Sequence, residues 1–176
     1  MLISERPMFG SGDRSTVSPK DGLWLGEDQE CAIDSSAPTA AWPGCATWII
    51  VRASGADLEL NDGKHQSQRL SSLFANGEPM IIEAQYVYNA KHPPTTTYVY
   101  FALDPQSLAP DGHFTRASVW PVECGIQEAG SSQIRSFPGV TPECRPTSQA
   151  AIHTAATASR RSEQLKSWRW VRAEGR

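Results

Sequence analysis

The sequence lacks a long hydrophobic run. None of its apolar stretches approaches the roughly 18–20 residues that a membrane-spanning helix needs, and its mean hydropathy is −0.41. Charged side chains are also sparse, at 20% of the 176 residues, against about 25% in typical globular domains. With 39% hydrophobic residues, which are enough for a core, these features exclude a transmembrane protein, a coiled coil and a wholly disordered chain. The 13 Gly and 13 Pro indicate a loop-rich domain built mainly of β-strands.

The sequence also lacks the common catalytic and nucleotide-binding motifs. No P-loop, GxGxxG, HExxH or EF-hand pattern is present, and Gly10-Ser11-Gly12 is not in the strand–turn–helix context of a nucleophile elbow. The histidines are spread along the chain without the spacing of metal ligands: His65, His92, His113 and His153. Cys124 follows Glu123, and an acidic neighbour disfavours a thiolate nucleophile. We therefore expect no cofactor, no metal and no enzymatic activity.

Charge of one sign is concentrated only at the C-terminal end. Residues 160–176 carry six basic and two acidic side chains, a net charge of +4, whereas the whole chain has a net charge of −3. With Trp168 and Trp170 this segment could contact anionic lipid or single-stranded nucleic acid. A solvated helix end followed by an edge strand is the favoured interpretation, and an isoelectric point near 5.8 argues against nucleic acid as a partner.

Four cysteines are present, in loop-like surroundings rich in Gly, Pro and polar residues: Cys31, Cys45, Cys124 and Cys144. They form no CxxC pair, which disfavours a zinc ribbon or a thioredoxin-like motif. An even number permits three disulfide connectivities, and four reduced thiols are the alternative. We favour Cys31–Cys45 and Cys124–Cys144, because each closes a short local loop that is worth about 3 kcal/mol in the chain-entropy model.

Short segments of the chain resemble an uncharacterised group of small bacterial envelope lipoproteins. Residues 1–9 resemble the start of a mature lipoprotein, and the other similar segments are Asp21–Trp24, Cys31–Asp34, Trp42–Ala46 and Arg169–Arg172. The resemblance implies export to the periplasm or outer envelope. A lipidated cysteine would stand about where Met1 stands, so we expect membrane attachment only through a lipid anchor that this chain does not carry. A cytosolic protein that begins at a natural Met1 is the alternative.

The pattern along the chain predicts a mainly β, α+β fold. Residues 1–20 are expected to be a flexible leader or tether, and residues 21–176 a single β-rich domain with one helix over about 147–165, capped by Thr147 or Ser148. Residues 64–78 are ambiguous, and residues 125–146 read as a loop. The expected strands are Gly22–Gly26, Ala46–Ala53, Asp57–Leu60, Met80–Tyr88, Thr95–Leu103, Gly112–Val122 and Ser167–Ala173. They form an antiparallel meander, open or closed into a barrel, with a returning last strand.

The hairpin of residues 80–88 and 95–103 supplies the candidate binding site. If Tyr88 lies opposite Thr95, the apolar side chains share one face of the hairpin and the polar ones the other. That polar face consists of Glu83, Gln85, Tyr98 and Tyr100. Its carboxyl could orient a sugar hydroxyl while the tyrosines stack on the ring, whereas ordinary pairing on a wet face is the simpler interpretation. Separately, Trp24, Trp48 and Trp120 could line a ligand cavity or pack in the core.

Three classes of function remain. The favoured one is a non-catalytic envelope domain that binds a partner protein, a cell-wall component or a small ligand. A structural accessory subunit of an envelope assembly is the second, and exposure of Tyr98, Tyr100 and Trp170 in one patch would favour it. The third is an enzyme with a dispersed active site near Glu83 or His113, which a deep pocket at those residues would favour.

Overall fold

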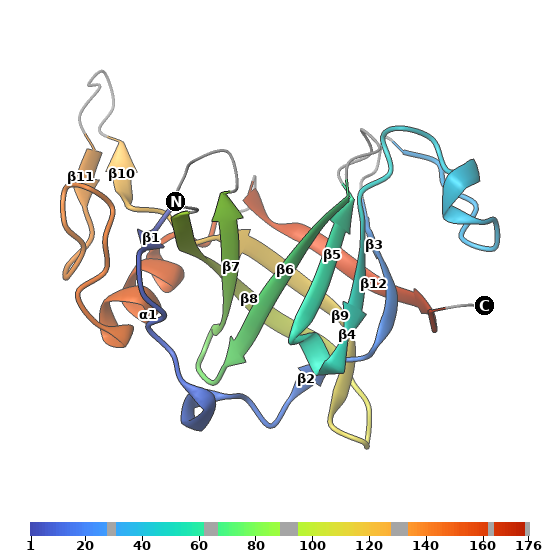
Figure 1. The fold of residues 1–176 in the computed structure, drawn as a ribbon, viewed down its shortest axis with the longest axis horizontal. Coiled ribbons are helices and arrows are strands. Elements are labelled where there is room, and N and C mark those ends of the chain that lie inside the picture. The colour runs from blue at the N-terminus through green and yellow to red at the C-terminus, as the bar shows by residue number, and fades with distance from the viewer. Residues whose placement is uncertain (28–30, 62–66, 89–94, 128–133, 162–163, 175–176) are drawn as a thin grey trace. The chain divides into compact units, whose positions relative to one another are not determined.

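The computed structural model of the chain describes residues 1–27, 31–61, 67–88, 95–127, 134–161 and 164–174 (Figure 1). The strands are β1 (Ile3–Ser4), β2 (Ser18–Pro19), β3 (Gly22–Gly26), β4 (Trp48–Arg52), β5 (Asp57–Asn61), β6 (Ser67–Ala75), β7 (Met80–Tyr88), β8 (Thr95–Leu108), β9 (His113–Pro121), β10 (Gly125–Gln127), β11 (Ile134–Ser136) and β12 (Lys166–Arg172). The helix α1 spans Gln149–Ala158, and the short 3₁₀ turns are η1 (Ser11–Asp13), η2 (Thr39–Ala41) and η3 (Ala53–Gly55).

The strands β3 to β9 form an antiparallel meander in which each strand pairs with the next. The chain then passes through α1, and β12 returns to lie between β9 and β3. Because β8 also pairs with β9, the eight strands β3 to β9 and β12 form a closed ring of hydrogen-bonded neighbours. The sheet is therefore an antiparallel β-barrel, which decides between the open and closed forms that the sequence permits.

The register of the central hairpin confirms the pairing expected from its side-chain alternation. Tyr88 lies opposite Thr95, and the pairing continues without a shift to Met80 opposite Leu103. A slip of one residue would exchange the two faces of each strand, so burial of the apolar set selects this register. The loop that joins the two strands, residues 89–94, lies outside the described residues.

The helix is shorter at its C-terminal end than the sequence predicts. Ser148 is the N-cap, as expected, and its hydroxyl accepts a hydrogen bond from the Ala151 amide at 3.1 Å. The last helical residue is Ala158, and the hydroxyl of the buried Ser159 turns back to donate to the Ala155 carbonyl at 2.7 Å. The pattern of buried alanines stops there because the polar Arg160 and Arg161 follow, so the apolar face of the helix does not continue.

Residues 1–20 are not a flexible leader, and that prediction is wrong. Leu2 is 0% exposed and Phe9 is 5% exposed, and both belong to the same buried cluster. The β1 strand pairs with β8, and β2 pairs in parallel with β9. The segment is mostly polar and rich in Gly, and its buried apolar residues Leu2 and Phe9 are too far apart to form a periodic pattern in the sequence.

Two further segments differ from expectation. The ambiguous residues 64–78 contain the long strand β6, because Leu70 and Phe74 face inward along an extended chain rather than on one side of a helix. Residues 125–146, expected to be a loop, contain a two-stranded sheet of β10 and β11. Gly125 permits this close pairing, since a Cβ at its position would lie 2.1 Å from the Arg135 carbonyl oxygen.

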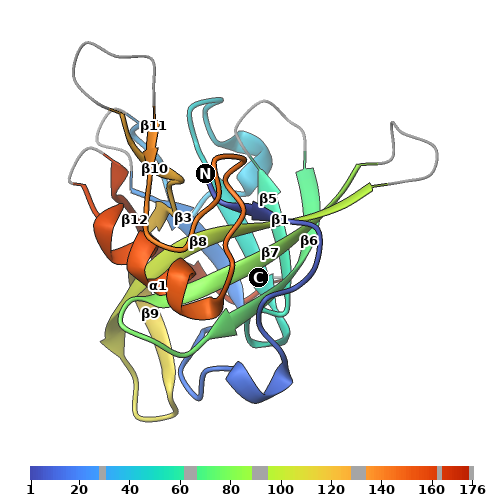
Figure 2. The ribbon, with the colours of Figure 1, turned by 90° about the vertical axis from the view of Figure 1, so that its left-hand side faces the viewer.

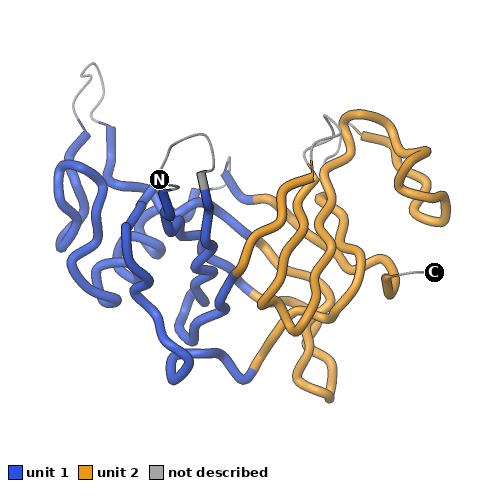
Figure 3. The backbone as a smooth tube through the Cα atoms, in the orientation of Figure 1, with its two compact units in different colours: residues 1–16, 72–104, 119–165 blue, residues 17–71, 105–118, 166–176 orange. Residues whose placement is uncertain are grey.

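The described chain divides into two compact units (Figure 3). Unit 1 comprises residues 1–16, 72–104 and 119–165, and unit 2 comprises residues 17–71, 105–118 and 166–176. In unit 1, Ile152, Ala155 and Ala156 of α1 (Figure 2) lie in one buried cluster with Tyr100 of β8 and Trp120 of β9, and the Trp120 indole nitrogen donates to the Ala156 carbonyl at 2.9 Å. In unit 2, Leu23, Leu25, Trp42 and Ala46 form a second cluster.

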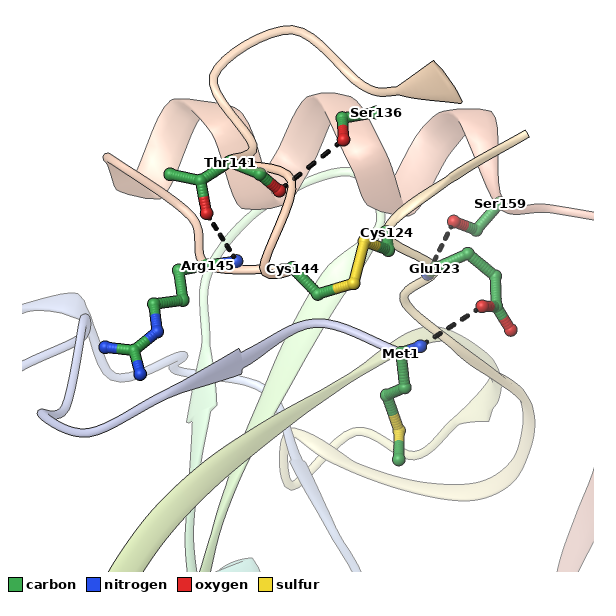
Figure 4. Close-up of a disulfide and its surroundings, with 8 residues drawn as sticks. All are labelled: Met1, Glu123, Cys124, Ser136, Thr141, Cys144, Arg145 and Ser159. Atoms are coloured by element: carbon green, nitrogen blue, oxygen red, sulfur yellow. Dashed lines mark hydrogen bonds and ion pairs between the residues drawn. A yellow bond between two sulfur atoms is a disulfide. The ribbon is translucent and has the colours of Figure 1, made fainter. Parts of the chain in front are cut away.

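Each unit contains one disulfide, and the two pairs are those expected from the local loops. Cys31 is bonded to Cys45, with Cα atoms 5.8 Å apart, and Cys124 to Cys144, with Cα atoms 5.0 Å apart. Near the second bond the Met1 ammonium lies 3.3 Å from the Glu123 carboxylate (Figure 4). Disulfides of this kind indicate an oxidising compartment. Within the described residues, no helix has the length and apolar character required to traverse a bilayer.

The burial of the N-terminal segment gives a stability prediction. We expect Phe9→Ala to lower the free energy of unfolding by about 3–5 kcal/mol, because it removes a ring from a closed core. Leu108→Ala is the control: that side chain is 58% exposed, so its truncation should change stability by no more than about 0.5 kcal/mol. Urea denaturation with the disulfides intact measures both, and equal, small effects of the two changes would mean that residues 1–20 do not contribute to the core.

Candidate functional site

Two of the four residues on the polar hairpin face, which the sequence suggests as a binding site, are buried in the structure. Glu83 is 4% exposed and Tyr100 is 0% exposed, while Gln85 and Tyr98 are half-buried. One carboxylate oxygen of Glu83 accepts hydrogen bonds from the backbone amides of Met8 at 2.6 Å and Phe9 at 3.3 Å. The expectation that Glu83 and Tyr100 are open to a ligand is therefore wrong, because the chain's own N-terminal segment lies over them.

Burial determines the electrostatics of this pair. Desolvation raises the pKa of Glu83 above its usual value of 4.5, although the two backbone amides and a hydrogen bond from Tyr100 oppose the shift. Desolvation also raises the pKa of Tyr100, whose hydroxyl is hydrogen-bonded to that of Ser4 at 2.6 Å. Glu83 and Tyr100 therefore hold the first ten residues in place through hydrogen bonds. The sequence contained one indication of this arrangement: Leu2 and Phe9 are large apolar side chains that are expected to be buried against the rest of the domain.

The two described histidines have separate local partners. His113 is hydrogen-bonded through Nδ1 to the hydroxyl of Ser18 at 3.0 Å in unit 2. Burial lowers the pKa of His153, whose ring lies edge-on to Phe9 with centroids 5.9 Å apart. His65 and His92 lie outside the described residues. Among the described residues, no three His, Cys, Asp or Glu side chains are grouped as metal ligands.

Unit 2 contains a partly open hollow of about 260 Å³, beside the loop that the Cys31–Cys45 disulfide closes. We call it the tryptophan hollow. It is lined by the loop residues Thr39, Ala40, Trp42, Pro43, Gly44 and Ala46, with Trp48 of β4 and Asn61 of β5. In the sheet, Trp48 and Asn61 are direct partners across the two strands, so the regular pairing of β4 with β5 places an indole and an amide side by side at one wall.

The disulfide loop that forms the other wall is held by several hydrogen bonds. The indole nitrogen of Trp42 donates to the Asp34 carbonyl at 3.0 Å, and the Trp42 amide donates to the Thr39 carbonyl at 3.1 Å. Asp34 in turn accepts from the amide and the hydroxyl of Ser36, and these hydrogen bonds lower the pKa of its carboxyl. The disulfide and these internal hydrogen bonds restrict the conformations that the loop can adopt.

Arg172, near the end of β12, fixes this loop from the barrel side. Its guanidinium donates to the carbonyl oxygens of Ser35 at 2.7 Å and Ala37 at 3.1 Å. The same group lies over the Trp42 ring, 6.0 Å from the ring centroid, a distance at which a cation–π attraction is effective. Three independent restraints therefore set the position of Trp42: the disulfide, the Asp34 carbonyl and the Arg172 guanidinium.

The described lining of the hollow is mainly aromatic and small, with two polar side chains. Its described lining contains two indoles, a proline, small residues, one hydroxyl and one amide, and none of those residues is a general acid, base or nucleophile at neutral pH. Sequence analysis named Trp48 as a possible cavity residue and missed Thr39, Trp42, Asn61 and Arg172. The available signal was a Trp-Pro-Gly segment inside a loop closed by a disulfide.

Comparisons with known proteins leave the family open. A scan against protein-family models finds no matching family, and searches of curated proteins and of solved structures find no match.

The raised pKa of Glu83 predicts a pH-dependent stability. The folded chain binds this proton more tightly than the unfolded chain, so the contribution of Glu83 to stability is greatest below pH 4.5 and is lost as the pH rises through the folded-state pKa. We expect Glu83→Gln, which cannot titrate, to gain stability relative to the parent over that rise, by up to about 1.4 kcal/mol per pH unit. Urea denaturation between pH 4 and pH 8 measures the difference, and a difference that is constant or falls with pH would contradict this account.

Proposed function

We propose that this protein is a non-catalytic, exported binding domain of the cell envelope, and that its ligand enters the tryptophan hollow. The observation that carries the proposal is the pair of indoles, Trp42 and Trp48, which line one partly open hollow in unit 2. Aromatic side chains supply large contact areas at a low cost in conformational entropy, which is why they are frequent in binding sites.

The rigidity of the hollow supports a binding role. Ordering a loop on binding costs free energy, so a site that is already ordered binds more tightly for the same contacts. Here the disulfide loop is closed at Cys31 and Cys45, and Arg172 holds two of its carbonyl groups.

The disulfides and the segment resemblance support a place in the periplasm or the outer envelope. Structural disulfides persist in oxidising compartments, and both pairs are formed here. On this proposal residues 1–20 are part of the folded domain rather than a tether.

The two alternative functions have less support. An accessory subunit would use an exposed patch of Tyr98, Tyr100 and Trp170, but Tyr100 is fully buried and the other two are half-buried. An enzyme near Glu83 would need that carboxylate to reach a substrate, and it is instead bonded to two backbone amides. A binding domain is therefore the function that we place first.

The site assignment can be tested by NMR. We expect small molecules from a mixed library of neutral, anionic, cationic and apolar compounds to shift the indole N–H signals of Trp42 and Trp48, assigned with Trp42→Phe and Trp48→Phe. The signal of Trp170, whose indole donates to the Asp21 carbonyl at 3.0 Å, serves as the control and should not move. If no compound of any class shifts the Trp42 or Trp48 signals, the hollow is not a binding site.

The compartment can be tested by trapping thiols in cells of the source organism. We expect the chain to be found in the envelope fraction with no cysteine alkylated before reduction and four alkylated after it, because both disulfides form after export. Recovery of the chain from the cytosolic fraction with four alkylated cysteines would refute the proposed location.

A further inference from the structure

We infer that the ligand of the tryptophan hollow is a neutral, β-linked hexopyranose unit of a longer glycan. This inference rests on the proposed function, because it names the ligand class of the same site. It is argued from four features of the hollow: its charge, its aromatic faces, its two polar groups and its size.

The charge of the lining favours an uncharged ligand. None of the eight described residues that line the hollow carries a charge. The nearest cation in the loop assembly, Arg172, already donates to Ser35 and Ala37. A phosphate or a carboxylate would lose hydration on entry and find no described partner of opposite sign, which costs free energy. An ammonium ion would find only the indole faces, and no described carboxylate of the lining, to replace its hydration. A neutral polyol loses less and is the better match.

The aromatic faces favour a flat, weakly apolar ring. Trp42 is only 8% exposed and packs with Leu23, Leu25 and Ala46 in the core, and its nitrogen already donates to the Asp34 carbonyl. Trp48, which is half-buried at the other wall, is therefore the indole that can present a ring face to a ligand. A face of an indole carries a negative potential, which attracts polarised C–H groups. A β-configured hexopyranose with equatorial substituents presents such C–H groups on both of its faces, whereas an α-linkage bends the chain away from a flat wall.

The two polar side chains suit hydroxyl groups. Thr39 contributes a hydroxyl, which can donate or accept, and Asn61, which already interacts within the protein, contributes an amide with donor hydrogens and an acceptor oxygen. Sugar hydroxyls also donate and accept, so they can adapt to both groups. Apolar walls with a small number of polar groups at the rim are the usual construction of sites that bind small ligands.

The size of the hollow favours one ring of a chain. Its volume of about 260 Å³ is below the roughly 300–1,000 Å³ of pockets that enclose drug-sized ligands. The hollow is also partly open, so the rest of a chain can continue into solvent on either side of the bound unit. A cell-wall glycan with β-1,4 linkages has this form, and so does a cellulose-type chain.

The experiment is a calorimetric titration with matched trisaccharides. Cellotriose and triacetylchitotriose represent neutral β-1,4 chains with and without the free 2-hydroxyl. Maltotriose has the same composition as cellotriose with α-1,4 linkages, and fully deacetylated chitotriose has the β-1,4 linkage with positive charge. We expect at least one neutral β-1,4 trisaccharide to bind at least about tenfold more tightly than maltotriose and deacetylated chitotriose, a difference of about 1.4 kcal/mol.

Variants then place the binding in the hollow. Trp48→Ala should weaken the affinity at least about tenfold, since it removes a stacked ring, and Trp48→Phe should recover part of the loss. Thr39→Val and Asn61→Ala each remove a polar group at the wall of the hollow, and each should weaken binding several-fold. Trp170→Phe, outside the hollow, is the matched control and should leave the affinity within about twofold of the parent. Because Thr39→Val changes only a loop side chain, it keeps the test valid if a Trp48 variant does not fold.

The outcomes separate this inference from the proposed function. Equal or tighter binding of maltotriose or of deacetylated chitotriose, with shifts at Trp42 and Trp48, overturns the ligand class and leaves the site intact. The same holds if only apolar or charged library compounds shift these two signals. Binding of β-1,4 trisaccharides that Trp48→Ala and Thr39→Val do not weaken also overturns the inference, because the sugar then binds elsewhere.

Discussion

The strand β12 is the constraint on which unit 2 and the candidate site depend. It pairs with β3 from Trp168 opposite Gly26 to Arg172 opposite Leu23, and it also borders β9. Without it, β3 and β9 would each have an unpaired edge, which is costly and prone to association. The same strand ends in Arg172, whose guanidinium holds the loop of the tryptophan hollow. Closure of the sheet and construction of the hollow thus share one segment of only seven residues.

The fold could be predicted where a local rule decides between few alternatives. Two-residue alternation fixed the register of the 80–88 and 95–103 strands, because any other pairing exposes the apolar set. Short loops between cysteines indicated the disulfide pairs, and a serine before an alanine-rich run marked the start of α1. The burial of residues 1–16 depends instead on widely separated partners such as Leu2 with Val122, whose backbone groups meet at 2.7 Å, and no local pattern reports such a contact.

In the candidate site, too, local patterns were predictable and contacts between distant segments were not. Glu83 and Tyr100 were chosen because they are polar residues on one face of a hairpin, and sequence alone cannot show that another segment covers that face. Trp42 belongs to a loop, and one of the three restraints on its position, Arg172, lies about 130 positions further along the chain. A site held partly by a distant side chain leaves only weak traces in the local sequence, namely the Trp-Pro-Gly segment and the neighbouring cysteines.

The order of the cysteines along the chain has a consequence for biogenesis. The first pairs with the second and the third with the fourth, so a chain that crosses a membrane from its N-terminus presents each correct pair before the next begins to emerge. An oxidase that joins thiols in order of their appearance then makes the right bonds at once. Such a protein has little need of a disulfide isomerase, and its maturation should depend on the oxidant alone.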